Sequence, residues 1–201
     1  MREPQNIKEV AKLQPDYLGL IFYEKSPRFV QGLAINLPVE VLQKLPKSIE
    51  KVGVFVNETT EKILQIAKHY ELKTLQLHGT ESPEFCSYLQ KRGFSIFKAF
   101  NIGTKNDILA IHAYQNSINL AVLDAKGTHL GGNGTSFDWT LLNDYSFEIP
   151  FLLSGGISLD NIAEVLVLKH PKLCGIDVNS KFEIAAGIKN VEMLRVLKLK
   201  L

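Results

Sequence analysis

Cysteine is scarce in this sequence and occurs only at Cys86 and Cys174, which lie far apart. Neither belongs to a CxxC pair or to the Cys/His spacing of a zinc site, and two cysteines do not make a dense disulfide framework. We expect both thiols to be reduced, buried and chemically inert. The sequence therefore predicts neither a metal site nor a disulfide-stabilised fold.

Long hydrophobic runs and an excess of charge of one sign are missing as well. No run approaches the roughly eighteen apolar residues of a membrane-spanning helix, and the N-terminal residues lack the apolar core of a secretory signal. The 23 Lys and Arg residues against 21 Asp and Glu residues give a net charge of +2 without a basic cluster. This pattern predicts no nucleic-acid or membrane partner, and we expect a cytoplasmic protein.

What the sequence does have is the composition of an ordinary globular domain, with 45% hydrophobic and 22% charged residues over 201 positions. These values exclude a disordered, collagen-like or coiled-coil chain. No Ser/Gly linker, charge block or composition shift divides the sequence, so we predict one domain over residues 1–201. The length lies at the lower edge of what a (β/α)₈ barrel normally needs.

Short apolar runs alternate with longer segments of helical period along the whole chain. The strand candidates are Tyr17–Phe22, Lys51–Val56, Thr74–His78, Ser95–Phe100, Leu120–Asp124, Phe151–Ser154 and Cys174–Val178. The helix candidates are Ile7–Leu13, Val39–Leu45, Thr60–Tyr70, Pro83–Arg92, Asn106–Tyr114, Leu159–Lys169 and Val191–Leu199, with a short one near Asp138. Apolar runs without polar alternation are typical of parallel strands covered on both faces. The pattern predicts an α/β fold, either a doubly wound sheet or a barrel that would need one more strand before Met1.

The residues just after the predicted strands are the functional candidates, because ligands of parallel α/β folds lie at the carboxyl ends of strands. Ser154-Gly155-Gly156 precedes a helix that we expect Ser158 to cap, which suits either phosphate binding or a tight strand-to-helix turn. Asn179 and Ser180 come after the last strand. Because the loops after the last two strands of a (β/α)₈ barrel often share a phosphate site, the pair of loops favours phosphate binding.

Three titratable or charged side chains stand at similar positions. Asp124 ends an apolar strand, where a carboxylate is costly, and is either a general acid or base or a structural cap of the next loop. His78 is either a site residue or a hydrogen-bonded residue of the rim. Arg28 either holds a carboxylate or phosphate through its guanidinium or faces solvent. The Gly131–Gly134 segment matches neither phosphate-binding fingerprint and is a loop over a site or a flexible connection.

Taken together in chain order, these residues resemble the phosphoribosylanthranilate isomerases, a family of (β/α)₈-barrel enzymes of tryptophan biosynthesis. The segments that carry the resemblance are Gly19–Tyr23, Ser26–Arg28, Val52–Asn57, Leu75–Gly79, Leu123–Lys126, Gly131–Gly134, Phe137–Trp139, Ser154–Gly156 and Gly175–Ser180. Each motif is weak alone, but their order and spacing over nearly the whole chain identify the family. The resemblance implies an Amadori rearrangement of N-(5-phosphoribosyl)anthranilate to 1-(2-carboxyphenylamino)-1-deoxyribulose 5-phosphate, without cofactor or metal.

The resemblance also implies roles for individual residues. Asp124 matches the general acid that protonates the furanose ring oxygen, and Arg28 matches the residue that holds the anthranilate carboxylate. The positions that bind phosphate in the family correspond to Gly155, Gly156, Asn179 and Ser180. The polar positions that line the substrate pocket correspond to Gln76, His78 and Asp177.

The general base of the family, a cysteine in a Cys-Gly pair that ends the first strand, has no counterpart in these residues. Met1-Arg2-Glu3-Pro4 resembles the family's residues directly after that pair, and neither Cys86 nor Cys174 matches its position. We therefore expect a TIM barrel without its first strand and an impaired enzyme, arising from a start codon assigned too late or from a chain that was produced from that shortened reading. The alternatives are a non-catalytic phosphosugar-binding barrel and another phosphosugar isomerase or epimerase.

Overall fold

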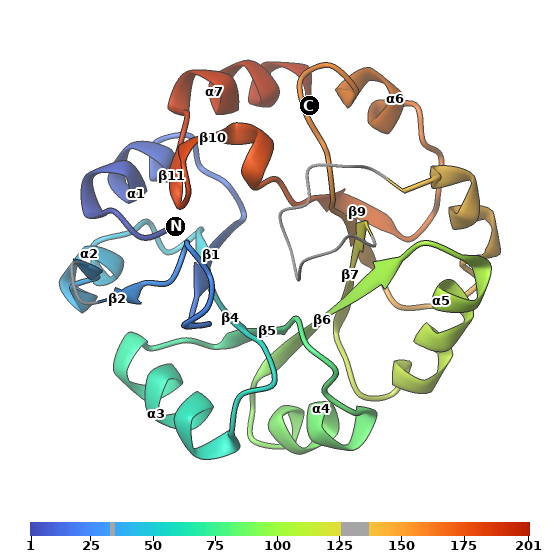
Figure 1. Cartoon of the computed structure of the whole chain (residues 1–201), viewed down its shortest axis with the longest axis horizontal. Helices are drawn as coiled ribbons and strands as arrows, with labels where there is room; N and C mark the ends of the chain where they lie inside the picture. The colour runs from blue at the N-terminus through green and yellow to red at the C-terminus, as the bar shows by residue number, and fades with distance from the viewer. Residues whose placement is uncertain (33–34, 126–136) are drawn as a thin grey trace. The chain divides into compact units, whose positions relative to one another are not determined.

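The structure is a computed structural model of the whole chain, and it describes residues 1–32, 35–125 and 137–201 (Figure 1). The chain divides into two compact units, each of which is described by itself. The first unit comprises Met1–Gln76 together with Phe182–Leu201, and the second comprises Leu77–Lys181. The prediction of one domain over residues 1–201 stays a prediction.

The first unit contains parallel strands flanked by helices. Strand β1 (Tyr17–Ile21) pairs in parallel with β4 (Glu50–Phe55), with Gly19 opposite Val52, and β5 (Thr74–Leu77) ends at the boundary with the second unit. The helices are α1 (Pro4–Ala11), α2 (Val39–Gln43), α3 (Thr60–Tyr70) and α7 (Val191–Lys200). Two antiparallel hairpins complete it, formed by β2 (Gln31–Gly32) with β3 (Ile35–Asn36) and by β10 (Glu183–Ala185) with β11 (Ile188–Lys189).

Aromatic side chains fill the interior of the first unit. Phe22 stacks on Phe55 with ring centroids 5.3 Å apart and contacts the ring of Tyr70 at 5.1 Å. All three are fully buried. Gly53 leaves room for this cluster, because a Cβ atom there would lie 2.6 Å from the side chain of Leu72. Burial of such large rings contributes favourably to the folding of this unit.

The second unit holds four parallel strands in the order β6 (Ser95–Ile102), β7 (Leu120–Ala125), β8 (Phe151–Leu153) and β9 (Leu173–Ile176). The segments before and between these strands contain the helices α4 (Pro83–Gln90), α5 (Lys105–Leu109) and α6 (Ile162–Leu166) and the 3₁₀ helices η1 (Ala110–Tyr114) and η2 (Trp139–Asp144). A third 3₁₀ helix, η3 (Ser180–Phe182), lies at the boundary with the first unit. Every residue of β7 and β8 is buried, whereas the residues of β9 are half-buried or exposed. Strand β9 pairs only with β8 among the described strands, and this edge position explains its exposure.

All seven strands predicted from the sequence are present, and their ends differ from the prediction by two residues at most. The parallel α/β fold is confirmed. Helix α3 spans the predicted residues, and α4 begins as predicted, with the Ser82 hydroxyl accepting from the Phe85 amide and Pro83 in the first turn. Because these caps are local, the sequence alone carries their signal.

The predicted helix over Leu159–Lys169 is wrong in length, because α6 covers only Ile162–Leu166. Ser158 is not its cap: the Ser158 amide donates to the Asn161 side chain, and this turn occupies the residues that were expected to form the first helical turn. The segment predicted as one helix over Asn106–Tyr114 divides into α5 and η1, and the two hairpins were not predicted. No helix within the described residues is long and apolar enough to cross a membrane.

Candidate active site

The second unit brings Asp124 and His78 together at the carboxyl ends of their strands. Asp124 lies near the end of β7 and is 6% exposed, and His78 comes directly after β5. Its Nε2 atom lies 3.4 Å from Asp124 Oδ2, while Asp124 Oδ1 accepts a hydrogen bond from the Ala125 amide at 2.9 Å. A buried carboxylate fixed on one oxygen and close to an imidazole on the other can donate or accept a proton at a defined place.

Gly155 packs against this carboxylate from the end of β8. Its φ of +79° and that of Gly156, +65°, lie in the left-handed region that glycine adopts without strain. A Cβ atom on Gly155 would lie 2.4 Å from the Ala125 nitrogen and 2.6 Å from Asp124 Oδ1. A side chain at this position would therefore displace the Asp124 carboxylate, which explains the need for glycine in physical terms.

The ends of β8 and β9 are linked side by side. The Asp177 amide donates to the Leu153 carbonyl at 2.8 Å, and the Ser154 hydroxyl donates to Asp177 Oδ2 at 3.3 Å. The segment that carries Asn179 and Ser180 comes directly afterwards, and both residues are half-buried. The two loops predicted to bind phosphate thus leave neighbouring strands at the same end. The expected helix dipole behind Gly156 is missing, because α6 begins six residues beyond it.

Arg28 lies in the first unit, in the loop after β1, and it is not solvated. Its Nε and Nη2 atoms donate to the two carboxylate oxygens of Glu183, with a shortest distance of 2.7 Å, and the two side chains are only 15% and 4% exposed. Lys189 Nζ donates to the same carboxylate at 3.2 Å, as does the Gly187 amide at 3.1 Å. One buried anion therefore orients a guanidinium in a bidentate geometry.

The charges of this cluster determine the ionisation of Glu183. Burial by itself raises the pKa of the Glu183 carboxyl, but the hydrogen bond from Arg28 and the positive charge of Lys189 outweigh it, so that the pKa is lowered. Two cations face one anion, which leaves one positive charge in excess. Such a cluster is suited to attract an anionic ligand.

Gln76 is a buried polar residue of β5, two positions before His78, at 8% exposure. Side chains two apart on an extended segment point to the same side. Gln76 and Arg28 belong to the first unit, and the other predicted site residues belong to the second. The predicted Gly131–Gly134 loop and Lys126 lie outside the described residues.

Sequence reasoning missed two buried charged residues beside His78. Lys98, in the middle of β6, and Glu81, just before α4, form an ion pair at 3.3 Å with side chains that are 3% and 4% exposed. A lysine within an apolar strand was a signal that could have found the pair. Sequence reasoning also missed Glu183, which lies 155 positions from Arg28 and has no local signal.

The two cysteines differ from each other. Cys86 is fully buried on α4, and burial raises the pKa of its thiol to about 11, as expected of an inert cysteine. The prediction that Cys174 is buried is wrong: it is exposed on β9, the edge strand, although its Sγ donates to the Phe151 carbonyl. Burial of part of the thiol raises its pKa as well, so neither cysteine is an activated thiolate.

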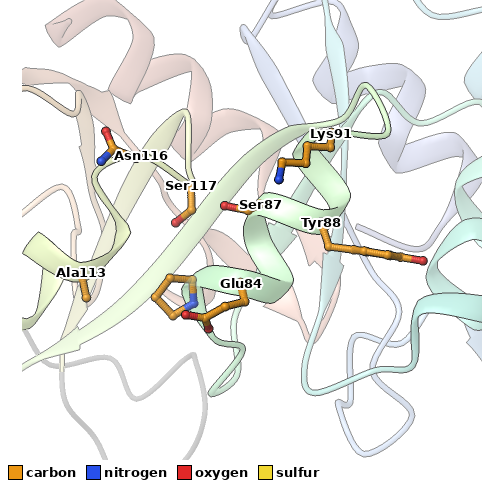
Figure 2. A pocket seen from close by; sticks show the side chains of 8 residues that line it. Glu84, Ser87, Tyr88, Lys91, Ala113, Asn116 and Ser117 are labelled. Atoms are coloured by element: carbon orange, nitrogen blue, oxygen red, sulfur yellow. The ribbon is translucent and has the colours of Figure 1, made fainter.

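A pocket of the second unit lies apart from these residues. It is lined by Pro83, Glu84, Ser87, Tyr88 and Lys91 of α4 and by Ala113, Asn116 and Ser117 in and after η1 (Figure 2). No predicted site residue lines it. Among the residues that the structure describes, no group of three or more His, Cys, Asp or Glu side chains is arranged to hold a metal ion.

Comparison with known proteins gives a consistent result over the whole chain. The family model of N-(5'phosphoribosyl)anthranilate (PRA) isomerase matches residues 1–198. The N-(5'-phosphoribosyl)anthranilate isomerase of Parabacteroides distasonis is 46% identical over 195 residues, which cover 97% of this chain and 87% of that protein. The enzyme of the same name from Trichodesmium erythraeum is 34% identical, with coverage of 94% and 88%.

Solved structures of the same family share the fold. The phosphoribosyl anthranilate isomerase of Thermotoga maritima superposes with a TM-score of 0.83 at 28% identity, covering 100% of this chain and 95% of that one. The structure of a phosphoribosyl anthranilate isomerase in complex with reduced 1-(o-carboxyphenylamino)-1-deoxyribulose 5-phosphate has a TM-score of 0.81 at 27% identity, with coverage of 98% and 93%. The match to the family model and the identity to these relatives show that the chain belongs to the N-(5'-phosphoribosyl)anthranilate isomerase family of tryptophan biosynthesis.

Proposed function

We propose that this isomerase rearranges N-(5-phosphoribosyl)anthranilate to 1-(2-carboxyphenylamino)-1-deoxyribulose 5-phosphate, with Asp124 as the general acid. The observation that carries the proposal is the buried Asp124 carboxyl group, held by the Ala125 amide and lying 3.4 Å from His78. The reaction is an isomerisation of one substrate molecule, driven by proton transfers to and from the enzyme. It therefore requires placed acids and bases and no added oxidant or reductant.

In the first step, the protonated Asp124 carboxyl group gives its proton to the furanose ring oxygen. The bond between that oxygen and C1 breaks, and the nitrogen lone pair forms a C=N bond, which leaves a Schiff base and an ionised Asp124. A base then removes the proton from C2, and the electron pair forms an enolamine that tautomerises to the ketone. The His78 ring lies on the side of Asp124 Oδ2 and supports the carboxylate after it has lost its proton.

Arg28 holds the anthranilate carboxylate in this proposal. Within residues 1–32, 35–125 and 137–201, Glu183 takes up Nε and Nη2, and no hydrogen bond uses Nη1. The guanidinium edge that carries Nη1 is thus oriented and available to a ligand. The test is Arg28→Ala, which we expect to weaken binding of anthranilate-bearing ligands far more than that of simple sugar phosphates. Equal losses for both would favour another phosphosugar isomerase or epimerase.

The phosphate is bound by the amides of Gly155 and Gly156 and by Asn179 and Ser180. The left-handed backbone of the two glycines and the parallel pairing of β8 with β9 support this part of the proposal. Asp177, which binds Ser154, and Gln76 complete the polar lining. We place the reaction in the cytoplasm.

The general base is the open element of the proposal. Neither Cys86, which is fully buried, nor Cys174, which lies at the start of β9, is placed at the end of a strand beside Asp124. We therefore propose that these 201 residues by themselves turn over the substrate about 10²–10⁴-fold more slowly than an isomerase with a cysteine base beside its general acid, the usual effect of losing a proton-transfer group. The same observation favours the second candidate function, a non-catalytic phosphosugar-binding protein.

Two measurements test these functions. Calorimetry with the reduced product analogue is expected to show binding by the 201-residue chain. Addition of an apolar strand that ends in Cys-Gly is expected to restore turnover, and Asp124→Asn in that extended protein to abolish it, whereas Asp16→Asn, an exposed control, leaves it unchanged. Tight binding without turnover in the extended protein would establish the non-catalytic alternative, and a normal rate in the 201-residue chain would disprove the role of the missing base.

A further inference from the structure

Lys98 carries a buried charge to which the proposed mechanism assigns no role. It lies within β6 with its side chain only 3% exposed, and it is paired with Glu81, 4% exposed. Because desolvation disfavours the charged form, burial lowers the pKa of the Lys98 ammonium despite the neighbouring carboxylate. A buried ion pair is on average weak evidence for stability, so its presence calls for another explanation.

The contacts of the ammonium group indicate what that explanation is. Lys98 Nζ donates to the carbonyls of Leu77 at 3.1 Å, Gly79 at 2.8 Å and Ala99 at 2.9 Å. Leu77 and Gly79 are the two neighbours of His78 in the chain. Glu81 completes the arrangement, because both of its carboxylate oxygens accept from the Gly79 amide, at 2.9 and 3.2 Å.

The pair therefore fixes the backbone on both sides of His78 and leaves the imidazole itself directed to Asp124. The Glu81 carbonyl is held in turn by the Tyr114 hydroxyl at 2.9 Å, which ties the segment to η1. Residues 78–81 are a short loop after β5, and without these bonds the same loop could adopt other turn geometries. The distance of 3.4 Å between His78 Nε2 and Asp124 Oδ2 depends on this loop geometry.

We propose that Lys98 and Glu81 are positioning residues, which act through the backbone of residues 77–79 to hold the His78 imidazole against the Asp124 carboxylate. The inference rests on the proposed function only in taking Asp124 as the general acid. Both side chains are buried, so the inference gives neither of them a contact with the substrate. Their task is to restrict His78 to one place, because small displacements of groups around a reacting centre are costly.

The test separates positioning from stability by using a charge-neutral pair. Lys98→Met alone leaves the buried Glu81 carboxylate without the Lys98 cation, whereas Lys98→Met with Glu81→Gln removes both charges and keeps an oxygen that can accept from the Gly79 amide. We expect the melting temperature of the double variant to recover most of what the single variant loses. We expect its affinity for the reduced product analogue to remain weaker by about tenfold, as for a misplaced site group.

A second readout reports on His78 without any ligand. In the native protein, Asp124→Asn is expected to move the imidazole nitrogen signals of His78 in the NMR spectrum, because the two side chains are in contact. In the double variant the same substitution is expected to move them much less. The matched control is Lys105→Met, which breaks the exposed Lys105–Asp144 pair of the same unit and is expected to leave the response of His78 unchanged.

An undiminished response of His78 to Asp124→Asn in the double variant would overturn the inference, and so would native affinity for the analogue together with recovered stability. If the double variant does not fold, Glu81→Gln alone, which leaves Lys98 on its three carbonyls, is judged by the same two readouts. A native chain that does not bind the analogue would contradict the proposed function, while the His78 signals would still decide the role of Lys98 and Glu81.

Discussion

Two buried ion-pair clusters, one in each unit, differ in charge and in what they hold. In the first unit, Arg28 and Lys189 share the single carboxylate of Glu183, which leaves one positive charge in excess. In the second, the charges of Lys98 and Glu81 balance each other, and the ammonium group donates to three backbone carbonyls. In our proposals, the first cluster presents an oriented cation to a ligand, and the second holds the backbone beside His78. A buried charge would then serve recognition where it is in excess, and positioning where it is neutralised.

The largest effect is expected when the balanced cluster is broken. Lys98→Met leaves the Glu81 carboxylate buried without its cation, and we expect a loss of about 3–5 kcal/mol in the free energy of unfolding. Urea denaturation measures it. The exposed pair formed by Lys105 with Asp144 is the control, since Lys105→Met is expected to cost at most about 1 kcal/mol. Similar small losses for both variants would remove the distinction between the two clusters.

A second, smaller effect is expected at Gly155, which brings the backbone of the second unit against Asp124. Gly155→Ala combines a left-handed φ with a contact of 2.4 Å to the Ala125 nitrogen, and we expect it to cost about 2–3 kcal/mol and to weaken analogue binding. Gly93 is the matched control, because its φ of +91° is also left-handed, but a Cβ there meets nothing within 4 Å. Gly93→Ala measures the backbone strain alone, and an equal cost at both positions would contradict the contact.

The orientation that Glu183 gives to Arg28 in the first cluster is tested by Glu183→Gln. The amide accepts from Arg28 without charge and no longer in a symmetrical bidentate geometry, so we expect affinity for the anthranilate-bearing analogue to fall about tenfold, or 1.4 kcal/mol. Binding of inorganic phosphate, measured by the same calorimetry, is expected to change little. Glu58→Gln, at an ion pair with Lys62 in the same unit, is the control. A larger loss of affinity for phosphate than for the analogue would contradict the proposal that Arg28 binds the anthranilate end of the ligand.

The smallest effect is a difference in the acid limb of the stability curve. The pKa of Glu183 is lower in the folded protein than in the unfolded chain, so its contribution is complete above the unfolded value of about 4.3 and is lost as the pH falls through the folded value. Native protein is therefore expected to lose unfolding free energy more steeply below about pH 4.3 than Glu183→Gln. Denaturation at a series of pH values measures the slopes, and parallel curves would contradict the shift.

The strands and the positions of Asp124 and His78 could be predicted from the sequence better than the two ion-pair clusters could. Leu120–Leu123 and the other apolar runs fix each strand locally, and the position of Asp124 and His78 at strand ends follows from parallel pairing. The partnership of Arg28 with Glu183 joins residues 155 positions apart, so no local pattern reports it. The length of α6 was overestimated because the side chain of Asn161 and the turn after Gly156 compete with the helix. The exposure of Cys174 depends on its edge strand, which periodicity does not reveal.

Two hydrogen bonds of Asn6, a residue of α1, affect the order in which the protein can fold during synthesis. The Asn6 side chain donates to the Lys189 carbonyl and accepts from the Lys189 amide, across 183 positions of the chain. The first unit is thus closed by two segments separated by the entire second unit. During synthesis, the first unit therefore cannot be completed before the residues from Phe182 onward have left the ribosome. We expect the growing chain to depend on chaperones, or on slow synthesis, for most of its translation.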